Sequence, residues 1–214
     1  MKLPTERPYY WLFALLALVG LWADQASKYV VFAKLYPSDR DRPTQLDVIP
    51  GCFALRTFYT FEQFPDNEWL SPLRTLSGPR VPHVNRGALF GIGNEGESGM
   101  NGVFAVISVL AAGFILLWAA RPSVAQDRFL SIALGLILGG TLGNLYDRVV
   151  FSGVRDFLYC YYDKHVWPDF NLADCCLVCG AGALLVHSFY ATEKDAQTAP
   201  AEATAEAAAP ANPM

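Results

Sequence analysis

Two aspartates placed against apolar stretches of the chain could carry out hydrolysis. Asp156 stands in a polar loop, and Asp174 opens the last long apolar stretch 18 positions later. Two carboxyl groups held close together cannot both ionise easily, so one of them keeps its proton. The ionised carboxylate can then act as a general base on water, while the protonated one acts as an acid toward a carbonyl group. The pair therefore indicates an aspartyl hydrolase, which needs no metal and no cofactor.

More polar and charged residues gather at the same predicted membrane surface. An ionisable residue in or beside a membrane span is costly and is therefore a candidate for a functional site. Residues three apart share a helix face, which pairs Asn144 with Asp147 and Asn171 with Asp174. The complete cluster on this surface consists of Asp24, Asn144, Asp147, Arg148, Asp156, Asn171 and Asp174.

A structural role is the alternative for each of these residues taken alone. An aspartate at the start of a helix is often a cap, because carboxylates favour helix N-termini, and this would explain Asp174. The neighbouring Asp147 and Arg148 could form a local ion pair at a helix end. Seven such residues on one predicted surface favour a functional site over seven separate structural roles.

Four apolar stretches must position this cluster. Of the 214 residues, 53% are hydrophobic and 17% are charged, against about 45–50% and about 25% in an ordinary soluble domain. Residues 101–120 contain no charged residue, and about 20 apolar residues are enough to cross the hydrocarbon core. We predict an all-α membrane protein whose four transmembrane helices cover residues 9–32, 102–120, 129–146 and 172–190.

The first of these stretches has the length of the apolar region of a signal peptide. Because apolar residues resume beyond Ala26, we interpret it as a retained helix. Asp24 and Lys28 lie near its outer end, and their spacing of four residues allows them to pair on one helix face.

The segments between the spans form two polar loops on the same side of the membrane. Residues 34–100 are rich in Pro and Gly, and residues 151–170 form the second loop. Four spans place both termini on the opposite side, although the raw count of Lys and Arg favours neither orientation. Within the first loop we expect a small extramembrane β-rich cradle, built from strand-like runs at residues 47–49, 52–60 and 88–92.

One membrane domain over residues 1–191 is followed by a tail over residues 192–214. The tail is composed mainly of Ala, Pro, Glu and Thr without apolar periodicity, so we predict that it is disordered. From residue 193 onward it contributes −3 of the net charge of −4. The remaining chain has no basic patch, which excludes nucleic acid as a partner.

The cysteines and the acids each leave a second class of function open. Buried cysteine usually acts as a small hydrophobic residue, but a four-span thiol oxidoreductase would use these side chains. A non-catalytic transporter would instead use the acids as a proton or ion path. The thiols concerned are Cys52, Cys160, Cys175, Cys176 and Cys179.

Five motifs, in order along residues 9–190, resemble those of the lipoprotein signal peptidases, also called signal peptidase II. The family pattern D-Q-x-x-K resembles residues 24–28, and I-P-G-F-F-x-L resembles residues 49–55. The pattern N-x-G-x-x-F-G resembles residues 85–91. The remaining patterns are G-G-x-x-G-N-x-x-D-R followed by G-x-V-x-D-F, which resembles residues 139–157, and F-N-x-A-D at residues 170–174.

The resemblance implies four transmembrane helices with a β-rich cradle and an enzyme of lipoprotein processing. Such an enzyme removes the signal peptide from diacylglyceryl-modified bacterial prolipoproteins and cleaves just before the lipidated Cys. Its implied location is the bacterial inner membrane, with the active site near the periplasmic face and both termini in the cytoplasm. The implied partners are prolipoprotein substrates and membrane lipid, and we expect a monomer.

By position, Asp156 and Asp174 match the catalytic pair of that family. The residues that match its substrate-binding or supporting positions are Asp24, Lys28, Asn85, Gly87, Asn144, Asp147, Arg148 and Asn171.

The chain departs from the family pattern at two places. Arg155 directly precedes Asp156, and a cation that pointed inward there would depress the pKa of the aspartate. Extra sequence at about residues 57–80 separates the second and third motifs and enlarges the outer lobe.

Overall fold

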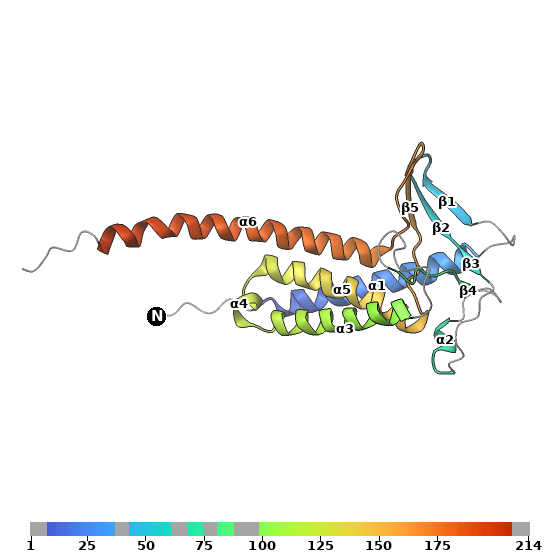
Figure 1. Cartoon of the computed structure of the whole chain (residues 1–214), viewed down its shortest axis with the longest axis horizontal. Coiled ribbons are helices and arrows are strands. Elements are labelled where there is room, and N and C mark those ends of the chain that lie inside the picture. The colour runs from blue at the N-terminus through green and yellow to red at the C-terminus, as the bar shows by residue number, and fades with distance from the viewer. Residues whose placement is uncertain (1–7, 37–42, 61–67, 75–80, 88–98, 207–214) are drawn as a thin grey trace, which may run out of the picture.

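Four long helices build the body of the protein. The computed structural model describes residues 8–36, 43–60, 68–74, 81–87 and 99–206. Each long helix contains a stretch that is long and apolar enough to cross a membrane, which confirms the predicted fold class. The helices lie side by side, and the strands gather at one end of the bundle (Figure 1). They are α1 (Tyr10–Lys34), α3 (Gly99–Ala119), α5 (Arg128–Val150) and α6 (Leu172–Glu206).

Two shorter helices and the C-terminal segment complete the helical part. The single-turn helices are α2 (Ser71–Arg74), within the extra sequence, and α4 (Pro122–Ala125), between α3 and α5. The backbone of α6 continues beyond the predicted span to Glu206, in an Ala-rich stretch where alanine favours helix. Residues 207–214 lie outside the described part of the chain, and the disordered tail stays a prediction.

An antiparallel sheet forms the cradle at the end of the bundle. Its four strands follow the order β1-β2-β5-β6, so the second loop pairs with the first. In the register between β2 and β5, Phe53 lies opposite Cys160 and Leu55 opposite Leu158. The strands are β1 (Thr44–Ile49), β2 (Phe53–Thr57), β5 (Leu158–Tyr162) and β6 (His165–Val166), with a separate pair of β3 (Tyr59–Thr60) and β4 (Val81–Pro82).

The sheet differs from the predicted cradle in its composition. The sequence predicts only a polar loop over residues 151–170, yet this loop supplies two of the four strands. Strand β5, which is rich in tyrosine, pairs with β2. Aromatic residues are common both in strands and at the membrane interface, so their presence alone does not indicate a strand. The strand expected at residues 88–92 lies outside the described residues.

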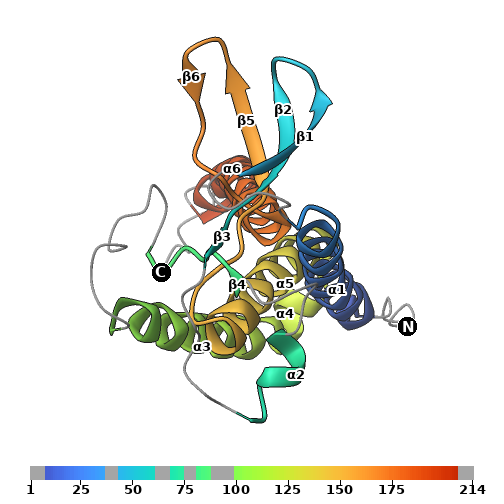
Figure 2. The same ribbon diagram turned by 90° about the vertical axis from the view of Figure 1, so that its right-hand side faces the viewer.

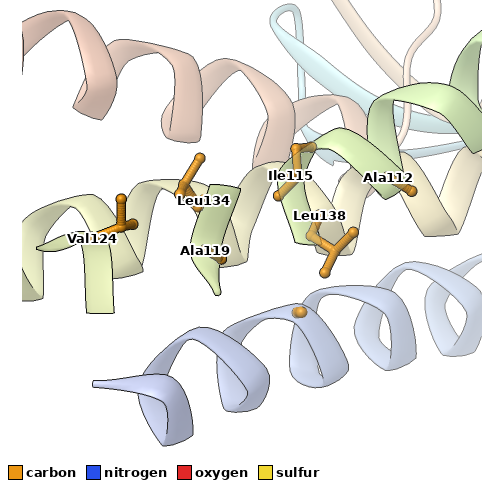
Figure 3. Close-up of a cluster of buried hydrophobic side chains, with 7 residues drawn as sticks. Ala112, Ile115, Ala119, Val124, Leu134 and Leu138 are labelled. Atoms are coloured by element: carbon orange, nitrogen blue, oxygen red, sulfur yellow. The ribbon is translucent and has the colours of Figure 1, made fainter. Parts of the chain in front are cut away.

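The central helix of the bundle is α5, which packs against α1, α3 and α6 and is the most buried of the four spans. A cluster of small and branched apolar side chains fills the space between α1, α3, α4 and α5 (Figure 3). It consists of Ala17, Ala112, Ile115, Ala119, Val124, Leu134 and Leu138. This packing places the outer end of α5 between those of α1 and α6, where the polar residues are.

Glycines on α5 allow the neighbouring helices to approach closely. A Cβ atom on Gly139 would lie 2.9 Å from the carbonyl oxygen of Ala17 in α1, and one on Gly143 would lie 2.6 Å from the carboxylate of Asp24. Small residues at such crossings permit backbone contact between membrane helices. The close approach of α1 to α5 brings Asp24 within reach of the site residues on α5 and α6.

Gly139→Ala should lower the free energy of unfolding by about 1–3 kcal/mol, because the added methyl group would force α1 away from α5. Thermal unfolding of the purified protein in detergent measures this change. Gly113→Ala in α3 is the matched control, because a Cβ there meets nothing within 4 Å. Equal stability of the two variants would contradict the close packing of α1 on α5.

Candidate active site

The start of α6 presents Asp174 through a reciprocal cap. Asn171 is the residue before the helix, and its Oδ1 accepts a hydrogen bond from the backbone N–H of Asp174 at 3.1 Å. The Oδ2 of Asp174 in turn accepts from the backbone N–H of Asn171, also at 3.1 Å. This is a capping box, in which two unpaired donors of a helix start are satisfied. The capping role considered for Asp174 is thus present, and it leaves the other carboxyl oxygen available.

Asn171 links the two candidate carboxyl groups. Its Oδ1 is held by the backbone of Asp174, so its amide group points outward from the cap. This Nδ2 donates to Oδ1 of Asp156 at 2.7 Å. A single asparagine therefore contacts both aspartates, one through its side chain and the other through its backbone.

Asn85 holds the second oxygen of Asp156. Its Nδ2 donates to Oδ2 of Asp156 at 3.2 Å, and its Oδ1 accepts from the backbone N–H of Gly87 at 3.0 Å. Two backbone hydrogen bonds with Val154, both 2.8 Å long, place Asn85 beside the loop that carries Asp156. The third motif is thereby brought against the fourth.

Asn144 holds the carboxyl group of Asp174 by a hydrogen bond. From the last turns of α5, its Nδ2 donates to Oδ1 of Asp174 at 2.8 Å. Lys28 in α1 donates to Oδ1 of Asn144 at 3.3 Å, which orients the amide so that its donor side faces Asp174. Each candidate carboxyl group thus accepts from two nitrogen donors.

The environment of Asp156 favours its protonated form. Burial, followed by the charge of Asp174, raises the pKa of Asp156 from its ordinary 3.8 to about 7, although the hydrogen bonds from Asn171 and Asn85 act in the opposite direction. The side chain lies deep among protein atoms but keeps part of its surface open to solvent. Around neutral pH, Asp156 can therefore hold a proton while remaining accessible to a substrate.

Four fully buried charges lie beneath the pair. Asp24, Lys28, Asp147 and Arg155 each have no solvent exposure. The Nζ of Lys28 lies 2.8 Å from Asp24 and 3.4 Å from Asp147. Arg155 binds Asp147 through its backbone N–H at 2.9 Å and through its guanidinium at 2.8 and 3.1 Å. Two cations therefore balance two anions, as buried charges require.

This buried ion cluster joins three helices and the loop that carries Asp156. Oδ1 of Asp24 accepts from the backbone N–H of Ala173 at 2.9 Å, where the start of α6 has unpaired donors and favours negative charge. Gln25 donates to the carbonyl of Gly143 at 3.0 Å and accepts from Arg155 at 2.9 Å. Gln25 was not among the predicted site residues, although the first motif contains it.

Arg155 does not act on Asp156 as the sequence allowed. Its side chain turns toward Asp147, and its guanidinium lies 3.8 Å from the ring centre of Phe151 and 4.4 Å from that of Tyr29. The pKa of Asp156 is raised by burial and by the charge of Asp174, so the lowering that a cation pointing at it could cause is not seen. Arg155 instead anchors the loop directly before Asp156.

Arg148 lies beside the pair from the last turn of α5. Its guanidinium donates to the carbonyl oxygen of Gly87 at 3.1 Å and to Oδ1 of Asn101 at 3.4 Å. The charges of Asp156 and Asp174 act on it electrostatically. Asn101, in the first turn of α3, is a second neighbour that sequence reasoning missed, because a lone asparagine at a span end carries no pattern.

All the predicted site residues thus meet at one end of the bundle. The residues that donate hydrogen bonds to the two aspartates are Asn85, Asn144 and Asn171. The residues around them are Asp24, Lys28, Gly87, Asp147 and Arg148. Among the residues that the structure describes, no three His, Cys, Asp or Glu side chains form a group that could hold a metal ion.

The chain is similar to several known proteins. Residues 80–190 match the family described as Signal peptidase (SPase) II. A lipoprotein signal peptidase of Maridesulfovibrio salexigens is 33% identical over 85% of this chain and 96% of its own. One of Cellvibrio japonicus is 34% identical over 93% and 99%. A solved bacterial membrane enzyme shares the fold with a TM-score of 0.66 at 22% identity, covering 90% of this chain and 96% of its own.

Four membrane helices that end in two carboxyl groups joined through one asparagine define an aspartic-type membrane peptidase. The family match is specific within that class. The chain belongs to the lipoprotein signal peptidase family, signal peptidase II, whose members cleave the signal peptides of prolipoproteins. This confirms the predicted peptidase and removes the thiol oxidoreductase and the transporter as alternatives.

Arg155→Met should destabilise the protein by about 3–5 kcal/mol, because it leaves the buried Asp147 with Lys28 as its main cationic partner. Thermal unfolding in detergent provides the measurement. Arg155→Lys should recover part of the loss, since lysine keeps the charge but not the planar guanidinium.

Arg56→Met is the matched control for a second arginine–aspartate pair. Arg56 lies 2.8 Å from Asp169 with 19% and 20% of the two side chains exposed, and exposure to solvent weakens an ion pair. We expect a smaller loss of stability than for Arg155→Met. An equal or larger loss would show that burial of the cluster is not what makes Arg155 important.

Proposed function

We propose that Asp156 and Asp174 are the catalytic pair, with Asp156 as the general acid and Asp174 as the general base. The observation that carries this proposal is the hydrogen-bonded bridge of Asn171, which contacts both carboxyl groups. The raised pKa of Asp156 supports its role as the protonated partner near neutral pH. Asp174 lies in the first turn of α6, where the helix start favours a negative charge.

The proposed reaction is hydrolysis of a peptide bond by general acid–base catalysis. The ionised Asp174 takes a proton from a water molecule as its oxygen attacks the carbonyl carbon of the substrate. Asp156 gives its proton to the carbonyl oxygen, which forms a neutral tetrahedral diol. In the collapse of the diol, the ionised Asp156 takes back a proton from one hydroxyl group as the bond from carbon to nitrogen breaks. The leaving nitrogen receives the proton that Asp174 took from water, so both carboxyl groups return to their starting states. The products are a new carboxyl group and a free amine.

The neighbouring residues position the pair and the substrate in this proposal. Asn85, Asn144 and Asn171 orient the carboxyl groups through their amide donors. Arg148 lies close enough to both acids to stabilise charge that develops between them. The supporting residues, which keep this arrangement rigid, are Asp24, Lys28, Gly87 and Asp147.

The proposed substrate is a prolipoprotein with a diacylglyceryl-modified Cys, cut on the N-terminal side of that residue. A site at the end of four membrane spans suits a signal peptide that is itself apolar and a cysteine whose acyl chains remain in the bilayer. The names of the similar enzymes, lipoprotein signal peptidases, agree with this substrate class.

The proposed location is the bacterial inner membrane, with the active site at the periplasmic face and both termini in the cytoplasm. The start of α1 and the end of α6 lie at the end of the bundle opposite the sheet (Figure 1), which supports a common side for the termini. We propose that residues 1–191 form the peptidase domain and that the enzyme acts as a monomer. Membrane lipid surrounds it, and residues 192–214 form a cytoplasmic tail.

Asp156→Asn and Asp174→Asn should each reduce cleavage of a lipid-modified prolipoprotein by at least about 10²-fold, since each removes a proton-transfer group. The assay uses purified enzyme in detergent, with the amount of folded protein checked by its unfolding transition. Asp163→Asn is the matched control, because Asp163 is an exposed turn residue with φ of 52°, a conformation that asparagine tolerates. Full activity in either of the first two variants would overturn the assignment.

A further inference from the structure

The short helix α2 stands apart from the peptidase machinery described above. It lies within the extra sequence at residues 57–80, for which the family motifs give no role. Residues 68–74 of that segment are described, and Ser71–Arg74 form the helix. Figure 2 shows α2 at the edge of the bundle, on the side away from the four-stranded sheet.

Contacts with two spans hold α2 in place. The hydroxyl of Tyr29 in α1 donates to the carbonyl oxygen of Leu73 at 2.7 Å. Nε of Arg74 donates to the carbonyl oxygen of Val150, the last residue of α5, at 2.5 Å. The final carbonyls of a helix lack intrahelical partners, so a basic side chain there satisfies one of them. Leu70 adds an apolar contact with the cluster of Val84, Val150 and Phe151.

These contacts place α2 beside the ends of two helices that are long and apolar enough to cross a membrane. Val150 ends α5, and Tyr29 lies five residues, about 7 Å, before the end of α1. The residues next to both tethers belong to the outer apolar surface of the bundle, since Val30 is 50% and Val149 53% exposed. Exposed apolar side chains of both spans therefore lie next in sequence to the residues that hold α2.

The exposed side of the α2 segment carries two large apolar side chains beside the polar Glu68 and Ser71. Trp69 is 90% exposed and Leu73 is 41% exposed. Tryptophan is enriched at the boundary between lipid and water, because its ring is apolar while its N–H group is a hydrogen-bond donor. In water the apolar ring would remain exposed at a cost, whereas the headgroup region removes the ring from water and still offers polar partners.

We propose that residues 68–74 form an interfacial anchor whose Trp69 inserts into the phospholipid headgroup region on the sheet side of the membrane. The tethers to Tyr29 and Val150 make this anchor a rigid extension of α1 and α5. The anchor thereby fixes the depth in the membrane of the bundle end that carries the active site. The anchor goes beyond the peptidase reaction, because none of its residues contacts the catalytic pair.

Tryptophan fluorescence in lipid vesicles tests this anchor. The full chain is reconstituted in phosphatidylcholine vesicles whose acyl chains carry bromine either near the headgroup or near the chain end. The chain has five tryptophans, so the contribution of Trp69 is the difference between the wild type and Trp69→Phe. We expect this component to be quenched more by bromine near the headgroup than by bromine near the chain end, and to resist quenching by aqueous iodide.

Trp22→Phe is the matched control for depth. Trp22 lies midway along α1 and is 72% exposed, so its component should respond more to bromine near the chain end. Quenching of the Trp69 component by iodide but by neither lipid would overturn the anchor and would leave α2 facing water, as a protein-binding surface would. Stronger quenching from the chain end would also overturn the interfacial position.

Discussion

Burying four charged side chains at the end of a membrane bundle costs several kcal/mol for each ion unless opposite charges and hydrogen bonds offset it. Asp24, Lys28, Asp147 and Arg155 meet this condition together, because two cations balance two anions with no exposed surface. Each of these charges comes from an element that must be in place for the others to be paired. The cluster therefore couples the packing of α1 and α5, the loop before Asp156 and the start of α6.

The candidate active site is built on this cluster through amides. Lys28 orients Asn144, which donates to Asp174, and Asp24 accepts from the first turn of α6, where Asn171 and Asp174 form their cap. Arg155 anchors the loop that carries Asp156. Amide donors can hold a carboxyl group in place without adding a full charge beside it. One carboxyl group can then keep its proton while the other remains ionised.

The sequence predicted the spans, and which polar residues lie together, better than the strands and the side-chain directions. Long apolar stretches are set by bilayer thickness, so each span was located from composition alone. The strands β5 and β6 were missed because Tyr159, Tyr161 and Tyr162 suit an interface belt as well as a strand. The direction of Arg155 depends on where α5 places Asp147, which no local pattern reveals. Likewise, nothing in the sequence near Trp69 shows that α2 is tied to Tyr29 and Val150.

The infrared absorption of protonated carboxyl groups, followed across pH on the purified protein in lipid, tests the central claim most directly. Asp156 should be protonated below its raised pKa of about 7 and ionised above it. The account predicts a carboxylic acid band that is lost as the pH rises through about 7 and that is absent from Asp156→Asn. A band lost only near the ordinary value of 3.8, or one unchanged in Asp156→Asn, would contradict the proton-sharing pair.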